Sequence, residues 1–143
     1  MLRDDLYLET DKFEHREVKD HFINPCCFGE DFAAWLREQI RDISSEGYVT
    51  HEPIQEDYGW GFWVERDRRD YWVALSYASG GPVPEPAHWV AIVAWEPGFD
   101  LVQRLFRRPD RSHFERLRDR IWGVIRSTPD IKVLSEDEWT KLA

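Results

Sequence analysis

The sequence predicts an α+β fold in which an antiparallel sheet of about four to five strands carries two main helices packed on one face. Three observations lead to this prediction. Three stretches are rich in β-branched and aromatic residues, two others repeat apolar residues at helical spacing, and the chain of 143 residues has the usual length of one domain. We therefore expect residues 1–143 to form a single globular domain.

The clearest strands are expected where β-branched and aromatic residues are concentrated, at residues 60–66, 71–79 and 88–96. The polar residues 66–70 are few enough to form a hairpin turn between the first two, and the segment 80–86, rich in Gly and Pro, connects the second to the third. Residues 49–54 and 131–134 are weaker strand candidates. Residues 13–23 suit either a strand or a helix, and we expect an edge strand there.

The first helix is expected at residues 31–46, because apolar side chains recur there every three or four positions. Glu30 and Asp31 lie in its first turn, where the positive end of the helix dipole favours a carboxylate. Gly47 is expected to end the helix, since glycine readily adopts the left-handed conformation found at helix ends.

The second helix is expected at residues 112–127, which carry a similar apolar stripe. Ser112 and Glu115 have the spacing of a capping box, in which each side chain bonds to a backbone amide of the first turn. Residues 101–107 permit a further short helix. Another is expected to begin at Ser135, which is followed by the same capping pattern.

Alternate side chains of a strand point to opposite faces of the sheet, so the residues of the three main strands fall into two sets. The first set is bulky and suits the face covered by the helices: Trp60, Phe62, Val64, Tyr71, Val73, Leu75, Tyr77, Val90, Ile92 and Ala94. The second set combines large flat rings with small residues: Trp63, Trp72, Ala74, Ser76, Ala78, Trp89, Ala91, Val93 and Trp95.

The second set is also apolar, although a sheet face in contact with water is normally polar. Two helices on one face leave little chain for the other, so its cover must be the N-terminal segment with loops, a second copy of the chain, or a partner. Exposed apolar surfaces of this kind are typical of interaction sites, in which Trp often supplies much of the binding energy. The sequence leaves two interpretations open: a second small core, and an interface anchored by Trp63, Trp72, Trp89 and Trp95.

The segment 56–61 has the composition of a site, because Glu56 and Asp57 precede a turn with two glycines and Trp60 opens a strand. Enzymes use carboxylate pairs for acid–base catalysis or to hold a metal ion. Adjacent residues of an extended segment point apart, however, so these two would act together only with Glu30 and Asp31 in a shared acidic pocket. The alternative is a turn in which the aspartate caps backbone amides.

Other catalytic or metal-binding motifs are absent from the sequence, which contains no phosphate-binding loop, dinucleotide fingerprint, nucleophile elbow or zinc-protease motif. The adjacent Cys26 and Cys27 cannot close an ordinary structural loop, and a site built from them and His21 is the weakest candidate. No two of the five histidines form a close ligand pair at helical spacing, and none belongs to a ligand pair of the C-x-x-C type: His15, His21, His51, His88 and His113. We therefore expect no cofactor, no metal and no catalytic residue.

The net charge of −9 is concentrated in residues 1–60, which hold 15 acidic and 6 basic side chains. Such a chain repels nucleic acid and attracts basic proteins at long range. Residues 104–126 differ, with eight arginines that suit either a phosphate or RNA site or a solvated helix face paired with the acidic half. No apolar run is long enough to span a membrane and the first residues lack a signal sequence, so we expect no membrane contact and a cytoplasmic location.

Two motifs carry a resemblance. The run NPCCFGEDFAAWL at residues 24–36 and the run EPIQEDYGW at residues 52–60 resemble a group of small uncharacterised bacterial proteins, over about residues 15–135. Small acidic α+β proteins of this sort are often immunity proteins or antitoxins, so the resemblance implies an inhibitory binding protein rather than an enzyme.

The sequence thus predicts a non-enzymatic interaction domain, like an immunity protein or antitoxin, that binds a basic protein partner such as a toxin or associates with itself through the second sheet face. The predicted binding residues are Trp60, Trp63, Trp72, Trp89, Trp95, Glu30, Asp31, Glu56 and Asp57. The alternative is a small hydrolase or ligand-binding enzyme that uses the acidic pocket.

Overall fold

The protein was analysed as a computed structural model that describes residues 2–25, 27–79, 85–95 and 110–142. In chain order its elements are β1 (Leu2–Glu9), α1 (Glu30–Gln39), the 3₁₀ helix η1 (Arg41–Glu46), β2 (Val49–Thr50), β3 (Ile54–Glu56), β4 (Gly59–Arg66), β5 (Arg69–Tyr77), β6 (His88–Trp95), α3 (Arg111–Arg126), β7 (Lys132–Leu134) and α4 (Glu136–Thr140). The short helix expected at 101–107 and most of the connection at 80–86 lie outside the described residues.

Within the described residues the sheet has seven strands, all paired antiparallel, in the order β2-β4-β5-β6-β1-β7, with β3 also paired to β4. The α+β class is confirmed, but the strand number exceeds the four to five predicted. β1 was not predicted, because Leu6 and Leu8 are the only buried residues of this strand and four of its eight residues are charged. The edge strand expected at residues 13–23 is wrong, since that segment forms turns and bends.

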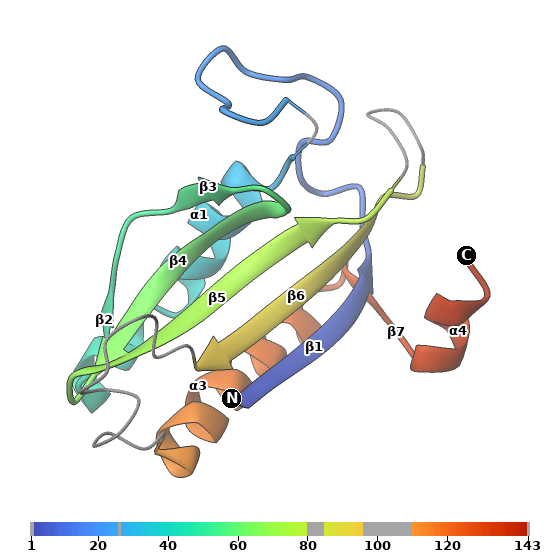
Figure 1. Ribbon diagram of the computed structural model, residues 1–143. Coiled ribbons are helices and arrows are strands. Elements are labelled where there is room, and N and C mark those ends of the chain that lie inside the picture. The colour runs from blue at the N-terminus through green and yellow to red at the C-terminus, as the bar shows by residue number, and fades with distance from the viewer. Residues whose placement is uncertain (1, 26, 80–84, 96–109, 143) are drawn as a thin grey trace.

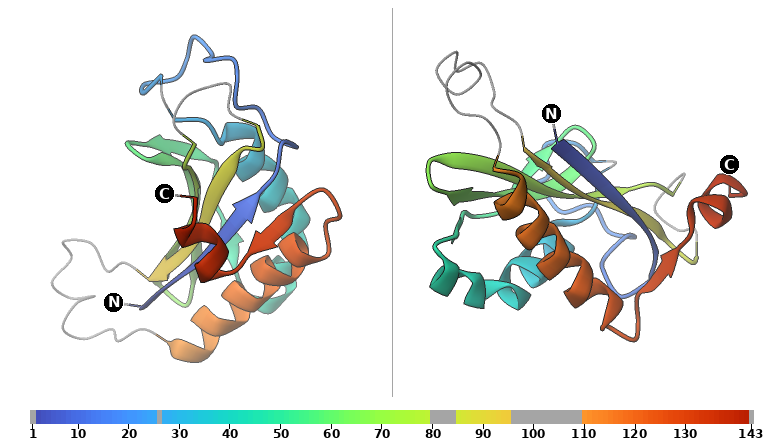
Figure 2. Two further views of the ribbon diagram at one scale, coloured as in Figure 1. Left: turned by 90° about the vertical axis from the view of Figure 1, so that its right-hand side faces the viewer. Right: turned by 90° about the horizontal axis from the view of Figure 1, so that it is seen from below.

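Helices α1 and α3 lie side by side on one face of the sheet, together with η1, as Figures 1 and 2 show. α4 lies beyond the edge strand β7 instead. Its Trp139 stacks on Tyr7 of β1 with ring centroids 4.8 Å apart, on the side away from the main helices. The prediction of two main helices on one face is therefore confirmed.

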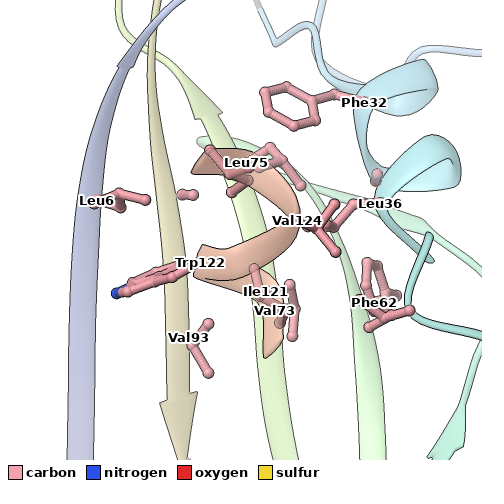
Figure 3. Close-up of a cluster of buried hydrophobic side chains, with 14 of the residues drawn as sticks. Leu6, Phe32, Leu36, Phe62, Val73, Leu75, Val93, Ile121, Trp122 and Val124 are labelled. Carbon is pink, nitrogen blue, oxygen red and sulfur yellow. The ribbon is translucent and has the colours of Figure 1, made fainter. Parts of the chain in front are cut away.

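The core lies between this face and α1 and α3, and Figure 3 shows Val73, Val93 and Leu75 of the sheet pointing toward Ile121 of α3. α3 contributes six buried apolar residues along one stripe: Phe114, Leu117, Ile121, Trp122, Val124 and Ile125. Burying a side chain of this size contributes about 1.5–3 kcal/mol, so the stripe is what holds the helix on the sheet.

The faces predicted for β6 are wrong. Trp89 lies opposite Tyr77 and Val93 lies opposite Val73, so these β6 residues share the helix-covered face with their partners on β5. Trp89 is fully buried and Trp95 is 6% exposed, both in the main core. Both alternating sets of β6 are apolar, so parity alone gave no sign of which one faces the helices; the pairing register with β5 decides it.

The helix ends differ from the sequence expectations in two places. The segment predicted as one helix at residues 31–46 is α1 followed by η1, and Gly47 ends it in the left-handed conformation with φ of 89°, as expected. α3 is capped by Asp110, whose carboxylate accepts a hydrogen bond from the His113 amide. The Ser112 hydroxyl donates to that same carboxylate, so the predicted capping box at Ser112 is wrong. The capping box at the start of α4 is confirmed.

Three arginines of α3 pair with acidic residues from the N-terminal third of the chain. Arg118 contacts Asp4 at 2.7 Å, and Arg120 contacts Asp42 at 2.8 Å. Arg116 contacts Glu46 at 2.7 Å in the same way. These three arginines therefore form ion pairs with acidic side chains of the same chain. Arg104, Arg107 and Arg108 lie outside the described residues. In the described ranges no helix is both long and apolar enough to cross a bilayer.

Candidate protein-binding face

The sheet face opposite α1 and α3, here called the second face, is organised in rows that run across the strands. Residues directly opposite each other in an antiparallel sheet share a face, so the register gives the rows. One row joins Trp63, Trp72, Ala94 and Arg3; the next joins Gly61, Ala74, Ile92 and Asp5. The second face is therefore built by β4, β5, β6 and β1.

A small second core forms at the centre of this face. It consists of Trp72, Ala74, Ile92 and Ala94, with Trp63 and Val90 packed against it. Trp72 is only 3% exposed. Its indole extends over Gly61, where an added Cβ would come within 2.6 Å of the ring. Glycine at position 61 is thus what lets the indole lie flat on the sheet.

Tyr58 covers the edge of Trp72 and is itself 43% exposed. The Trp72 indole N–H donates a hydrogen bond of 2.6 Å to the Tyr58 hydroxyl, and the Ser76 hydroxyl donates one of 2.9 Å to the Tyr58 carbonyl. These bonds fix the short turn between β3 and β4 against the sheet. Tyr58 therefore presents a ring to solvent in a defined position.

A pocket of ≈ 250 Å³ opens beside these rings, lined by Arg3, Tyr58, Trp72, Ser76 and Ile92. Three of these lining residues are aromatic or aliphatic, and the other two, Arg3 and Ser76, are polar. Arg3 donates two hydrogen bonds to Asp5, at 2.9 and 3.2 Å.

Two carboxylates lie in the row beyond the tryptophan pair. Trp63 and Trp72 face each other with ring centroids 4.9 Å apart, and in the next row of the same two strands Glu65 lies opposite Asp70. No lysine or arginine of the described chain lies within ion-pair distance of either carboxylate, and His51 Nε2 lies 3.8 Å from a carboxylate oxygen of Glu65. Burial raises the pKa of Asp70, the charge of Glu65 raises it further, and His51 acts in the opposite direction.

Like charges directly opposite each other destabilise a sheet, so this acidic pair is unfavourable in the isolated chain. Together with Tyr58, Trp63 and Trp72 it forms what we call the aromatic–acidic patch. A guanidinium or ammonium group stacked on Trp63 would reach both carboxylates, because successive residues on one face of a strand are only about 7 Å apart.

The predicted tryptophan anchors are divided between the two faces. Trp63 is half-buried and lies on the second face as predicted, and Trp72 lies beneath Tyr58 on the same face. Trp89 and Trp95 lie in the main core. Trp60 is also buried there, and its indole N–H donates to the Cys27 carbonyl at 2.9 Å. Of these five tryptophans, only Trp63 is more than marginally exposed to solvent.

The two predicted carboxylates of α1 have separate partners. Glu30 lies 2.5 Å from His21 and 3.8 Å from Lys19. Asp31 accepts hydrogen bonds from the backbone amides of Glu14 and Phe32, and burial raises its pKa above the usual value. Both side chains are thus used to fix the loop that precedes the helix.

The other two predicted carboxylates lie at the β3–β4 turn. Asp57 accepts a hydrogen bond of 3.2 Å from the Asn24 side chain, and the half-buried Glu56 lies opposite Gly59. Neither the pocket beside Tyr58 nor a second one of ≈ 210 Å³ between α1 and β2 is lined by any of the four carboxylates. The geometry therefore offers no argument for the acidic enzyme pocket.

Sequence reasoning missed Tyr58 and the pair Glu65 and Asp70. The hairpin itself carried the signal for the acidic pair, because counting back from the turn at Asp67 and Arg68 places Glu65 opposite Asp70. Tyr58 gave no such signal, since it lies in a turn and its ring reaches the sheet only in the folded chain.

Comparisons with known proteins found no relative of this chain. No protein-family model, no curated protein and no solved structure matches the chain.

Proposed function

We propose that the protein is a non-enzymatic binding domain, of the kind represented by immunity proteins and antitoxins, that holds a basic protein partner against its second sheet face. The observation that carries the proposal is the aromatic–acidic patch, in which the Trp63–Trp72 pair lies beside two carboxylates that lack a lysine or arginine within the described chain. A partner's arginine would complete the patch, since its planar group stacks on indole and bonds to carboxylates at once.

The overall charge supports the same class of partner. A net charge of −9 attracts a basic protein at long range and raises the rate of encounter. The central residues supply the short-range part: Trp63 and Tyr58 are partly exposed rings on a rigid sheet, and the pocket beside Tyr58 accepts a single inserted side chain. Binding through the aromatic–acidic patch therefore requires no conformational change of the domain.

The test compares four forms of the tagged protein as baits in extracts of the cells that produce it. These are the wild type, Trp63→Ala, the double variant Glu65→Gln/Asp70→Asn, and a control, Glu17→Gln/Asp20→Asn. The control removes the same two charges from exposed positions in the loop before α1. It therefore separates a local effect of the patch from an effect of net charge.

The wild type and the control are expected to retain one basic protein in stoichiometric amount, and the two patch variants to bind it at least ten-fold more weakly. Binding should also weaken as salt rises. Equal retention by all four forms, or capture of no stoichiometric partner, would contradict the proposal. Self-association through the face would instead appear as a dimer of the wild type in sedimentation that Trp63→Ala converts to a monomer.

A further inference from the structure

A second cluster of polar groups lies away from the second face, where the connection between β1 and α1 meets the start of β6. Figure 1 shows both segments at the same end of the sheet. Asp11, His15 and Glu85 each offer one ligand atom there, and these atoms all lie within 4.8 Å of one another. We propose that these three side chains bind a divalent transition-metal ion, independently of the proposed protein-binding function.

His15 is the central observation, because its ring is buried and its polar atoms lack hydrogen bonds. The side chain is 2% exposed, and neither ring nitrogen has a hydrogen-bond partner within the described chain. Its Nε2 lies 3.2 Å from Asp11 Oδ1, but without the alignment of a hydrogen bond. A buried polar group left in this way costs about 1–3 kcal/mol, so a missing ligand is the economical explanation.

The backbone around the cluster is fixed by contacts that do not involve a metal. Asp11 Oδ1 accepts a hydrogen bond of 2.9 Å from the Ala87 amide, which ties the β1–α1 connection to the segment that carries Glu85. Phe13 stacks on Phe32 at 3.9 Å between ring centroids, and the His15 ring lies 6.1 Å from the Tyr77 ring at an interplanar angle of 28°. His15 is therefore held between rigid neighbours, and a metal would need to order only the two carboxylates.

Both carboxylates have room to adjust, since the side chains of Asp11 and Glu85 are 43% and 47% exposed. Ligand atoms around a tetrahedral zinc ion are roughly 3.3 Å apart, so small rotations of these side chains would close the site. Glu85 also pairs with Arg16. The arginine is a competing cation, and removing it should strengthen metal binding.

The donor set indicates the class of metal. One imidazole nitrogen and two carboxylates suit zinc or manganese, whereas calcium and magnesium favour sites made entirely of oxygen ligands. Three protein ligands also leave at least one coordination position for water. Asp11 and His15 are four residues apart in the sequence, but they lie in an irregular loop, and Glu85 comes from a distant part of the chain. The sequence alone therefore did not predict this site.

Two titrations of metal-free, untagged protein test the proposal. In the first, Zn²⁺ is added in competition with a fluorescent chelator. In the second, Mn²⁺ is added and the paramagnetic broadening of the histidine ring signals is measured by NMR. Mn²⁺ is included because thiols bind it poorly, so Cys26 and Cys27 cannot mimic the result. The wild type is expected to bind Zn²⁺ with Kd below about 10 μM and to show Mn²⁺ broadening centred on His15. Glu85→Gln and Asp11→Asn should weaken binding at least ten-fold, and Arg16→Ala should tighten it.

The matched control is His21→Gln, which removes an exposed histidine that also lies beside a glutamate. It should leave the affinity unchanged. Because Glu85 is exposed, Glu85→Gln should fold normally, and unchanged thermal unfolding without metal will verify this. Binding weaker than about 1 mM in the wild type, or a loss in His21→Gln with none in Glu85→Gln, would overturn the proposal.

Discussion

Glu65 and Asp70 lie directly opposite each other across the β4–β5 hairpin, on the face that carries the Trp63–Trp72 pair. The two like charges weaken the hairpin in the isolated protein and become favourable only when a positive group lies between them. Stability and binding should therefore respond to these residues in opposite directions. A residue retained only for folding would not behave in this way.

Asp70→Asn is the direct test of this opposition. The substitution should raise the free energy of unfolding near neutral pH by about 0.5 kcal/mol, because the repulsion from Glu65 is removed. Urea unfolding measures the change. Asp67→Asn in the adjacent turn is the control and should give no gain, since Asp67 contacts Arg69 at 3.2 Å. If Asp70→Asn were less stable than the wild type, Glu65 and Asp70 would not be a destabilising pair.

The pH dependence of stability should carry the same signature. Folding raises the pKa of Asp70, so the folded chain keeps this proton to a higher pH than the unfolded chain. The contribution of Asp70 to the free energy of unfolding therefore falls as the pH rises from the unfolded pKa through the folded pKa. Urea unfolding from pH 3 to 7 measures the free energy of unfolding of the wild type and of Asp70→Asn. The advantage of Asp70→Asn should grow as the pH rises from the unfolded to the folded pKa of Asp70, and should be constant above the folded pKa.

Asp110 should show the opposite dependence. Its hydrogen bonds from the Ser112 hydroxyl and the His113 amide lower its pKa. The stability that it contributes is thus present above the unfolded pKa and is lost as the pH falls through the folded pKa. Asp110→Ala should cost about 1 kcal/mol at neutral pH, as for other helix caps, and Asp110→Asn much less, because the amide oxygen still accepts from His113. Equal losses in the two variants would argue against the cap.

The two faces of the sheet can be distinguished by tryptophan substitutions. Trp89→Ala should cost about 3–5 kcal/mol, because Trp89 is fully buried in the main core. Trp63→Ala should cost far less, since its ring is only half-buried at the margin of the second core. Chemical denaturation of both variants gives the comparison. Similar losses would mean that the face assignment is incorrect.

Tyr58→Phe tests the bond that fixes the β3–β4 turn. Loss of the hydroxyl removes the 2.6 Å bond from the Trp72 indole N–H and should cost about 1 kcal/mol. The indole N–H signal of Trp72 should shift in the NMR spectrum, while that of Trp60, which bonds to the Cys27 carbonyl, should not. An unchanged Trp72 signal would show that the two groups are not bonded in solution.

The sequence by itself determined most of the elements. The patterns at β4, β5 and β6 predicted three strands to within about two residues, and the apolar stripe of α3 predicted its helix, because these features depend on local alternation and spacing. β1 was not predicted, because its charged residues obscure the alternation of apolar side chains along the strand. Its place in the sheet follows only from its pairing with β6 and β7.

Only the tertiary structure decided which side chains share a surface. The register of β5 with β6 placed Trp89 and Trp95 in the core, although their sequence pattern was equally compatible with the second face. Folding likewise brought Tyr58 onto Trp72, and Glu85 to the buried His15. The physical reason is the same in each case: spacing along the chain fixes the direction of a side chain within its own element, whereas its neighbours depend on pairing between distant segments.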